Sequence, residues 1–281
     1  MAFAFPDQTD DLLVADAAFA AAYDTCTAEE RAAVKTAIAR TAAACGGAED
    51  VSHQTRVRMR QGFSLYKVSR PASWTVILLD STQASPARML AALVPAILAG
   101  VPDIVVCRVV QDGTPFPQGL LAALELAGQE LVMECGPKEA LSLVAHCCKT
   151  DTHGRLVLLG QDDIFGDVAH IAAEWDAPLL RYGAAIRIGI AASSFAAPVS
   201  DAILRFAHPD ADLTRVDVDI AQDAFSAVFC AETAVQQYLG MTSLVLSPGN
   251  EAYWIWRGLS RSFFTETIQG VSSGDADISA L

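Results

Sequence analysis

Residues 74–109 read WTVILLDSTQASPARMLAALVPAILAGVPDIVVCRV, and this stretch decides the fold. Thr75–Leu79 is a short run of β-branched and apolar residues, which predicts a buried strand. A polar turn, Asp80–Gln83, follows, and Pro86 marks the first turn of a helix. Ile104–Val109 is the next strand-like run. A strand, a helix and a second strand in this order predict a βαβ unit with parallel strands.

The same alternation of short apolar runs and helical patterns continues beyond residue 109. Strand-like runs occur at Leu131–Glu134 and Leu156–Leu159, and a proline opens the helical pattern that precedes each of them. A further helical pattern extends from about Asp163 to Trp175. Strands that alternate with helices in this way form parallel sheets with helices on their faces. We therefore predict a doubly wound, mostly parallel α/β core over residues 70–195.

The flanks of this core have different patterns. Residues 1–69 are assigned as an N-terminal helical segment, because Thr27–Glu30 has the sequence of a capping box ahead of an alanine-rich helix. Residues 196–281 are assigned as a reduced second α/β part with a polar, frayed tail at residues 272–281. In this part we expect helices at residues 198–207 and 232–239 and short strands at residues 227–230 and 244–246.

The charge balance limits the possible partners. The chain has 19 Lys and Arg residues against 33 Asp and Glu residues, a formal net charge of −14. Nucleic acids and anionic membranes need a basic surface, so neither is expected as a partner. The one basic run, within Val51–Val68, contains Arg56, Arg58, Arg60 and Lys67. It is interpreted as a solvated strand or helix edge rather than a binding site.

The cysteines and the apolar runs indicate a cytoplasmic protein. Seven cysteines are present, an odd number, and no Cys-x-x-Cys pair occurs. Free thiols in a reducing compartment explain this count better than a disulfide framework does. The first residues have no basic region typical of a secretory signal. The longest apolar stretch, Met89–Ile97, is too short to cross a bilayer and contains Pro95.

Standard cofactor and metal motifs are missing from the sequence. No Gly-x-Gly-x-x-Gly follows a predicted strand, and there is no Walker loop, His-Glu-x-x-His or Gly-x-Ser-x-Gly. His146, Cys147, Cys148 and His153 lie close together in sequence, but their spacing matches no standard zinc pattern. No metal site is therefore predicted from this cluster.

Four segments, in order along the chain, together resemble one known family. They are the helix and strand at Ala87–Val106, the turn at Cys135–Ala140, Ser200–His208, and Ala227–Glu232 with its continuation to Leu246. These segments resemble the histidinol dehydrogenases, and with the N-terminal helix the likeness covers about residues 20–270. The resemblance implies a homodimer with one zinc per site. It also implies oxidation of an amino alcohol to an amino acid with two NAD molecules, assisted by a Glu–His acid–base pair.

The resemblance also implies that the zinc site is lost. The family's Gln ligand falls on Arg205, a permanent cation that cannot bind zinc and would repel it. The Asp ligand falls on Gln237, which has no charge, and the last His ligand belongs to a segment that this sequence lacks. His208 is the only retained ligand position, and a single His does not make a zinc site. Zinc is therefore not expected.

Catalytic and cofactor positions differ from the family in the same way. Only nineteen residues, Pro209–Ala227, span the gap in which the family carries its Glu–His pair, and a second catalytic His aligns with Leu244. No catalytic residue is therefore assigned. Acidic residues replace the family's glycine-rich turns, at Asp80 and at Asp162–Asp163, and Glu139 replaces a Gln. Carboxylates disfavour a pyrophosphate, so NAD is not expected to bind in the family's manner.

Three hypotheses for function follow, and the sequence leaves them open. The first is a non-catalytic, dimeric scaffold that binds a small molecule or a protein partner. The second is an NAD-dependent oxidoreductase with a rebuilt active site, whose candidate residues at the strand ends are Asp80, Ser81, Gln83, Glu139, Asp162, Asp163 and His208. The alternative for these residues is a role in polar loops and helix caps. The third is a structural subunit with an interface at Tyr253–Trp256, which core packing explains equally well.

Overall fold

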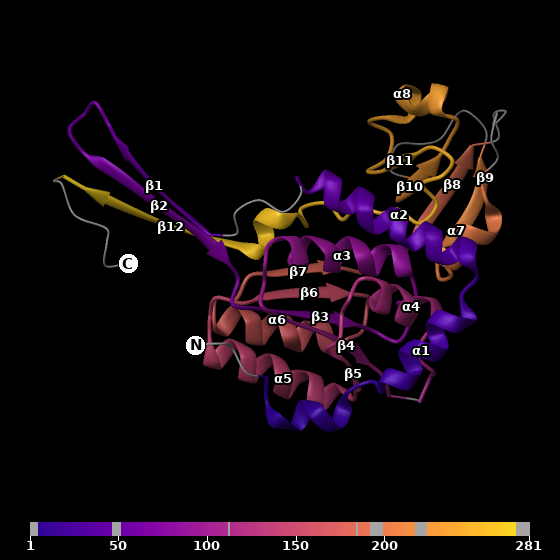
Figure 1. The fold of residues 1–281 in the computed structure, drawn as a ribbon, viewed down its shortest axis with the longest axis horizontal. Coiled ribbons are helices and arrows are strands. Elements are labelled where there is room, and N and C mark those ends of the chain that lie inside the picture. Colours follow the sequence, from indigo (N-terminus) through magenta and orange to yellow (C-terminus); the bar gives the residue numbers. More distant parts are fainter. Residues whose placement is uncertain are drawn as a thin grey trace.

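A five-stranded parallel sheet forms the centre of the protein in the computed structural model (Figure 1). The structure describes residues 5–46, 52–111, 113–183, 185–191, 199–216 and 224–273. The strand order is β5-β4-β3-β6-β7, and every neighbouring pair is parallel. The strands are β3 (Trp74–Leu79), β4 (Asp103–Val109), β5 (Val132–Cys135), β6 (Arg155–Leu159) and β7 (Leu179–Tyr182).

Helices cover both faces of this sheet. Side chains along a strand alternate between the faces, so Ile77 and Leu79 pack with α3 (Pro86–Leu98) and α4 (Gln118–Leu126). Val76 and Leu78 pack on the other face, with α5 (Pro137–Thr150) and α6 (Ile164–Glu174). The predicted doubly wound α/β core is therefore confirmed. Its strand order reverses between β3 and β6, and in such folds ligands bind beyond the carboxyl ends of these strands.

A second, four-stranded parallel sheet packs beside the first. Its order is β11-β10-β8-β9, and β8 pairs with both β9 and β10. Its elements are β8 (Arg187–Ala191), α7 (Asp201–Ala207), β9 (Asp212–Val216), β10 (Ala227–Phe229), η2 (Glu232–Ala234), α8 (Val235–Tyr238) and β11 (Val245–Leu246). The boundary expected between residues 195 and 196 lies outside the described residues. Because β8 already belongs to the second sheet, that sheet begins earlier than the sequence indicated.

The N-terminal helices lie against α3 and α4. They are α1 (Asp16–Thr25) and α2 (Ala28–Ala44), whereas the short η1 (Asp7–Leu12) before them contacts β5. The predicted capping box is present at the start of α2, where the Thr27 hydroxyl oxygen accepts the Glu30 N–H and the Glu30 carboxylate accepts the Thr27 N–H. Phe19 and Val34 enter the same buried cluster as α3 and α4.

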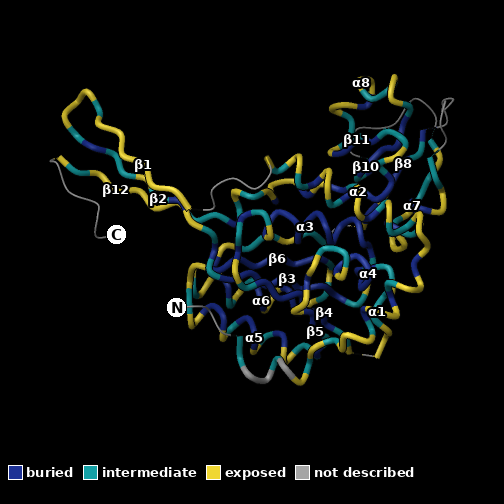
Figure 2. The backbone as a smooth tube through the Cα atoms, in the orientation of Figure 1, coloured by how far each residue is buried: buried dark blue, intermediate teal, exposed yellow. Residues whose placement is uncertain are grey.

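The helical assignment of residues 1–69 is wrong over its last part. β1 (His53–Arg58), β2 (Ser64–Pro71) and β12 (Thr265–Ser272) form an antiparallel sheet that projects from the body, here called the arm (Figures 1 and 2). η3 (Arg261–Phe264) leads into β12, whose last residue, Ser272, is the first residue of the tail that was expected to be frayed. Residues 274–281 of that tail lie outside the described residues. β1 and β2 form a hairpin, and β12 joins it from almost 200 residues away, a pairing that no local pattern reveals.

No helix in the described part of the chain is long and apolar enough to cross a membrane.

Candidate functional site

A small cavity lies at the carboxyl ends of β3, β6 and β7. Its volume is about 210 Å³. The loops that follow these strands supply one wall, and Arg88 of α3, Asp210 and Trp256 supply the other. The lining residues are Thr82, Gln83, Arg88, Gly160, Gln161, Tyr182, Gly183, Ala185, Ile186, Asp210 and Trp256. This cavity, here called the crevice, occupies the place where doubly wound folds bind their ligands.

Asp80 joins the two loops at the reversal of strand order. Its carboxylate is buried, with 2% of the residue exposed. Oδ1 accepts the N–H groups of Thr82 and Gln83, each at 3.0 Å, and the Thr82 hydroxyl at 2.6 Å. Oδ2 accepts the N–H groups of Gln161 at 2.5 Å and Asp162 at 3.3 Å. Four backbone donors and one hydroxyl therefore converge on one carboxylate, and hydrogen bonds to a charged acceptor are the stronger kind.

The close approach of Asp80 explains the glycine that follows β6. Gly160 has a φ of +133°, a conformation that other residues rarely adopt. A Cβ atom at this position would also lie 2.0 Å from Asp80 Oδ2. Gly160 is therefore required both by its backbone conformation and by the carboxylate beside it.

This arrangement does not fit a dinucleotide bound in the usual manner. A pyrophosphate is held by backbone N–H groups at this end of the sheet. Here the Asp80 carboxylate already accepts the N–H groups of the loops after β3 and β6. A phosphate at the same place would find these donors already bonded to Asp80. It would also lie close to the negative charge of that carboxylate.

An ion pair between a buried arginine and a partly exposed aspartate forms the opposite wall of the crevice. Arg88 is 4% exposed, and its Nη2 contacts Asp210 Oδ1. Burial lowers the pKa of the Arg88 guanidinium, while the nearby Asp210 opposes this shift. The Trp256 indole donates to the Arg88 carbonyl at 2.9 Å, and its ring stacks on Tyr182 with centroids 4.5 Å apart. Burial raises the pKa of the Tyr182 phenol to about 12, so it stays protonated near neutral pH.

Two buried polar atoms, one in each wall of the crevice, have no hydrogen-bond partner in the described part of the chain. They are Gln83 Oε1 and Arg88 Nε. Unpaired buried polar atoms are costly in a folded protein, so they mark places where a water or a ligand is accommodated. The crevice can therefore hold a small polar molecule, although it is too small for a dinucleotide.

His208 is enclosed and serves as a structural contact. It is 1% exposed, with Nε2 3.0 Å from the Glu251 carbonyl oxygen and Nδ1 3.4 Å from Ser85 Oγ. Burial, together with the positive charge of Arg88, lowers the pKa of the imidazole to about 3. Both ring nitrogens face protein atoms, so the geometry does not fit a zinc ligand. Within the described residues, no three His, Cys, Asp or Glu side chains come together in a metal-binding group.

The other residues singled out from the sequence are spread over the surface. Arg205 is exposed on α7 and Gln237 is exposed on α8. Glu139 lies in the first turn of α5. Its Oε2 lies close to Gly136, since a Cβ atom added to Gly136 would be 2.7 Å from this oxygen. Asp163 is the N-cap residue of α6 but makes no side-chain cap bond.

Three sequence candidates lie near the crevice. Asp80 and Gln83 are buried there, and Ser81 is half-buried between them. Asp162 contributes its backbone N–H to Asp80, and its Oδ1 accepts the Ile164 N–H at 3.0 Å as a helix-start contact. The carboxylates of Glu139, Asp162 and Asp163 thus lie at helix starts, as the loop-and-cap alternative describes.

Sequence reasoning missed the residues of the opposite wall. Arg88 carried the one available signal, because it is a lone charge within an apolar helix, and a buried Arg needs a partner. Its partner, Asp210, lies 122 positions later. Nothing in the local pattern linked these residues to each other or to Tyr182 and Trp256.

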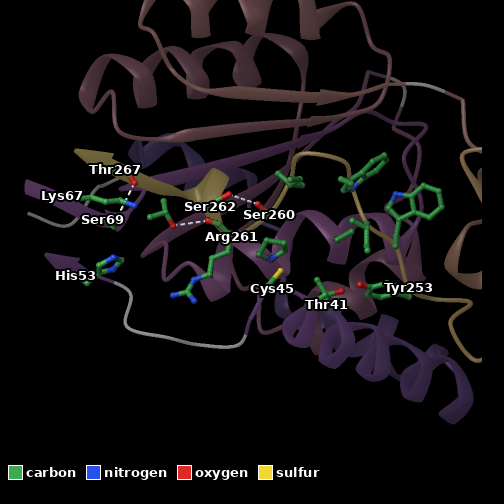
Figure 3. A pocket seen from close by; sticks show the side chains of 18 residues that line it. Thr41, Cys45, His53, Lys67, Ser69, Tyr253, Ser260, Arg261, Ser262 and Thr267 are labelled. Carbon is green, nitrogen blue, oxygen red and sulfur yellow. Dashed lines mark hydrogen bonds between the residues drawn. The ribbon is translucent and has the colours of Figure 1, made fainter. Parts of the chain in front are cut away.

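A much larger cavity lies elsewhere, at the base of the arm (Figure 3). Its volume is about 1110 Å³, and it is bounded by α2, α3, the arm and residues 253–267. Among the described residues, Trp256 alone lines both this cavity and the crevice.

Comparisons with known proteins agree with the observed fold. A family model described as histidinol dehydrogenase matches residues 2–166. No curated protein matches the chain. Among solved structures, a histidinol dehydrogenase from Elizabethkingia anophelis superposes with a TM-score of 0.58 and 14% identity, covering 93% of this chain and 76% of that one. An aldehyde dehydrogenase variant from Bacillus cereus gives a TM-score of 0.50 and 7% identity, covering 92% and 82%. At these identities the structural likenesses show the fold alone.

Replacing Asp80 with Asn tests the junction of the two loops. The substitution Asp80→Asn removes the charge and turns an amide donor toward N–H groups that need an acceptor. We expect the free energy of unfolding to fall by about 2–3 kcal/mol. Asp163→Asn is the matched control, because Asp163 makes no side-chain cap bond, and we expect a change within about 0.5 kcal/mol. Urea unfolding measures both, and equal effects of the two variants would contradict this role of Asp80.

The pH dependence of stability tests the enclosure of His208. Because its folded pKa of about 3 lies below the usual value of 6.5, the unfolded chain binds a proton that the folded chain does not. The free energy of unfolding therefore falls as the pH drops from about 6.5 toward 3, with a His208 contribution of up to about 1.4 kcal/mol per pH unit.

His208→Gln should remove that contribution from the pH profile. His146→Gln, at an exposed position of α5, is the control and should leave the profile unchanged. The measurement is the urea unfolding midpoint of each variant from pH 4 to pH 8. Profiles of the same slope for His208→Gln and the unmodified chain would refute the enclosed, neutral imidazole.

Proposed function

The chain belongs to the histidinol dehydrogenase family, and we propose that it uses the family's fold to bind a ligand or partner without zinc- and NAD-dependent histidinol oxidation. The observation that carries this proposal is the Asp80 carboxylate, which accepts the backbone N–H groups of both loops at the crevice. The backbone N–H groups that would bind an anionic cofactor at this end of the sheet are therefore already bonded to Asp80.

The positions implied for zinc and for proton transfer support the same proposal. Arg205 and Gln237 stand at two of the ligand positions, and both side chains are exposed on separate helices. His208 stands at a third, where protein atoms face both of its nitrogens. Leu244 stands at the position of a catalytic His, and a leucine side chain cannot transfer a proton.

A second candidate function is an NAD-dependent oxidoreductase with a rebuilt active site. The observation in its favour is that Arg88 and Asp210 in one wall and Gln83 in the other place ionic and amide groups beside a cavity. Gln83 Oε1 and Arg88 Nε are buried without a hydrogen-bond partner among the described residues. These groups differ from those that the family resemblance implies, so any reaction here would use other residues.

Thermal unfolding of the purified chain with NAD, NADH and Zn²⁺, separately and together, distinguishes the two functions. A ligand that binds the folded state raises the melting temperature by mass action. We expect no shift with any of the three at millimolar cofactor or micromolar Zn²⁺. A shift with NAD that is retained without Zn²⁺ would support the rebuilt oxidoreductase, and a shift with Zn²⁺ alone would overturn the argument about the lost ligands.

We also propose that the protein is a cytoplasmic homodimer in which the arm of one copy contacts the body of the other. The seven cysteines are all free of disulfides, which suits a reducing compartment. The arm, together with the turn at residues 59–63 that joins β1 to β2, holds five of the 19 Lys and Arg residues but only Glu266 among the 33 Asp and Glu residues. A basic arm on an otherwise acidic chain is complementary to the body of a second copy.

Light scattering coupled to size exclusion tests the homodimer. We expect a mass of twice 29.7 kDa at micromolar concentration. The double variant Arg56→Glu and Arg58→Glu should dissociate it, because β1 is exposed along its length and the attraction becomes repulsion. Lys138→Glu with Lys149→Glu, on α5, is the control of equal charge change. A 29.7 kDa monomer of the unmodified chain at every concentration would rule out the homodimer.

A further inference from the structure

The cavity at the base of the arm has two chemically different ends. Figure 3 shows His53, Lys67, Ser69 and Thr267 together at one end, while Tyr253 lies at the other. The described residues that line it are Thr41, Ala44, Cys45, His53, Lys67, Ser69, Ala91, Pro95, Tyr253, Trp254, Ile255, Trp256, Leu259, Ser260, Arg261, Ser262, Thr265 and Thr267. A ligand that spans the cavity must therefore match a polar, basic end and an aromatic end.

The strand register of the arm builds the basic end. His53 and Thr267 are both paired with Ser69, and Lys67 lies two positions from Ser69 on the same face of the sheet. Neither Lys67 nor His53 makes a salt bridge with any residue that the structure describes. Hydroxyl groups of Ser69 and Thr267, 3.4 Å apart, add further donors beside the Lys67 ammonium.

The composition of this lining is unusual for such an acidic chain. The chain carries 33 Asp and Glu residues, yet none of the described residues that line the cavity is acidic. Lys67, His53 and Arg261 all line it, so the described wall has the opposite sign to the chain as a whole. A cleft lined by one sign of charge attracts ligands of the other sign.

The other end of the cavity is aromatic and apolar. Trp254 and Trp256 meet edge to face with centroids 5.7 Å apart, and Leu259 packs in the same buried cluster. Ile255 is 48% exposed beside them. The Trp254 indole Nε1 is buried without a hydrogen-bond partner in the described part of the chain. Flat apolar groups pack well against such a wall.

We propose that this cavity binds an organic anion with a flat, apolar body, whose charged group lies at Lys67 and whose body lies at the tryptophans. The volume of about 1110 Å³ slightly exceeds the usual range for small-molecule sites, so the ligand is drug-sized or larger. Burial raises the pKa of the Cys45 thiol, which lines the middle of the cavity, so this thiol adds no negative charge near neutral pH. The site is independent of the function proposed for the crevice.

Fluorescence titration of the full chain with two related probes tests the site. The anionic probe is 1-anilinonaphthalene-8-sulfonate, and N-phenyl-1-naphthylamine is the neutral probe with the same rings and no sulfonate. We expect the unmodified chain to bind the sulfonate at least about fivefold more tightly than the neutral probe. This is the gain in affinity that one ion pair near a protein surface provides. Lys67→Met should remove this preference and leave the affinity for the neutral probe unchanged.

The control is Arg56→Met, which makes the same charge change in the same arm. Arg56 is paired with Tyr66 and Lys67 with Thr55, so Arg56 lies on the other face of the sheet. This variant should keep the preference, and Lys67→Gln provides a second test of the Lys67 position. Equal binding of both probes, no binding of either, or an unchanged preference in both Lys67 variants would overturn the proposal. So would sulfonate binding that appears only when a dimer dissociates, because the cavity would then belong to an interface between copies.

Discussion

The hydrogen bonds from two loops to the Asp80 carboxylate are the constraint on which the candidate site depends. They join the loop after β3 to the loop after β6 at the reversal of strand order, where a doubly wound sheet is otherwise open. The position of Gly160 follows from this carboxylate, because no side chain fits beside it. The Asp80 carboxylate, whose charge is unfavourable for the family's cofactor, is thus a structural element beside the crevice.

Further buried polar contacts connect the first sheet to the second. Arg88 of α3 pairs with Asp210 beyond α7, and His208 contacts both Ser85 and the Glu251 carbonyl. The apolar residues of the second sheet, such as Ile188 and Phe229, belong to the same buried cluster as α3 and α4. Buried charges are costly unless they are paired, so these contacts fix how the two sheets meet and give the crevice its shape.

Four of the five strands of the central sheet could be predicted from sequence because they and the helices between them have strong local patterns, whereas the short strand β7 was not predicted. The runs at residues 75–79 and 104–109, separated by a helix, were sufficient for the doubly wound core, and the four family-like segments indicated the family that is confirmed. The arm, β8 and β9 were missed because their strands are short or exposed, and because β12 pairs with a strand almost 200 residues away. At the site, Asp80 and Gln83 were among the candidates expected at the strand ends, and of these two Gln83 lines the crevice. Their roles, and the Arg88–Asp210 pair, depend on contacts that only the folded chain creates.

The most direct test of this account is a crystal structure of the chain determined in the presence of millimolar NAD. The account predicts that the Asp80 carboxylate remains bonded to the N–H groups of Thr82, Gln83 and Gln161, with no dinucleotide at the loops after β3 and β6. A pyrophosphate bound to these N–H groups, with the Asp80 side chain turned away, would contradict it.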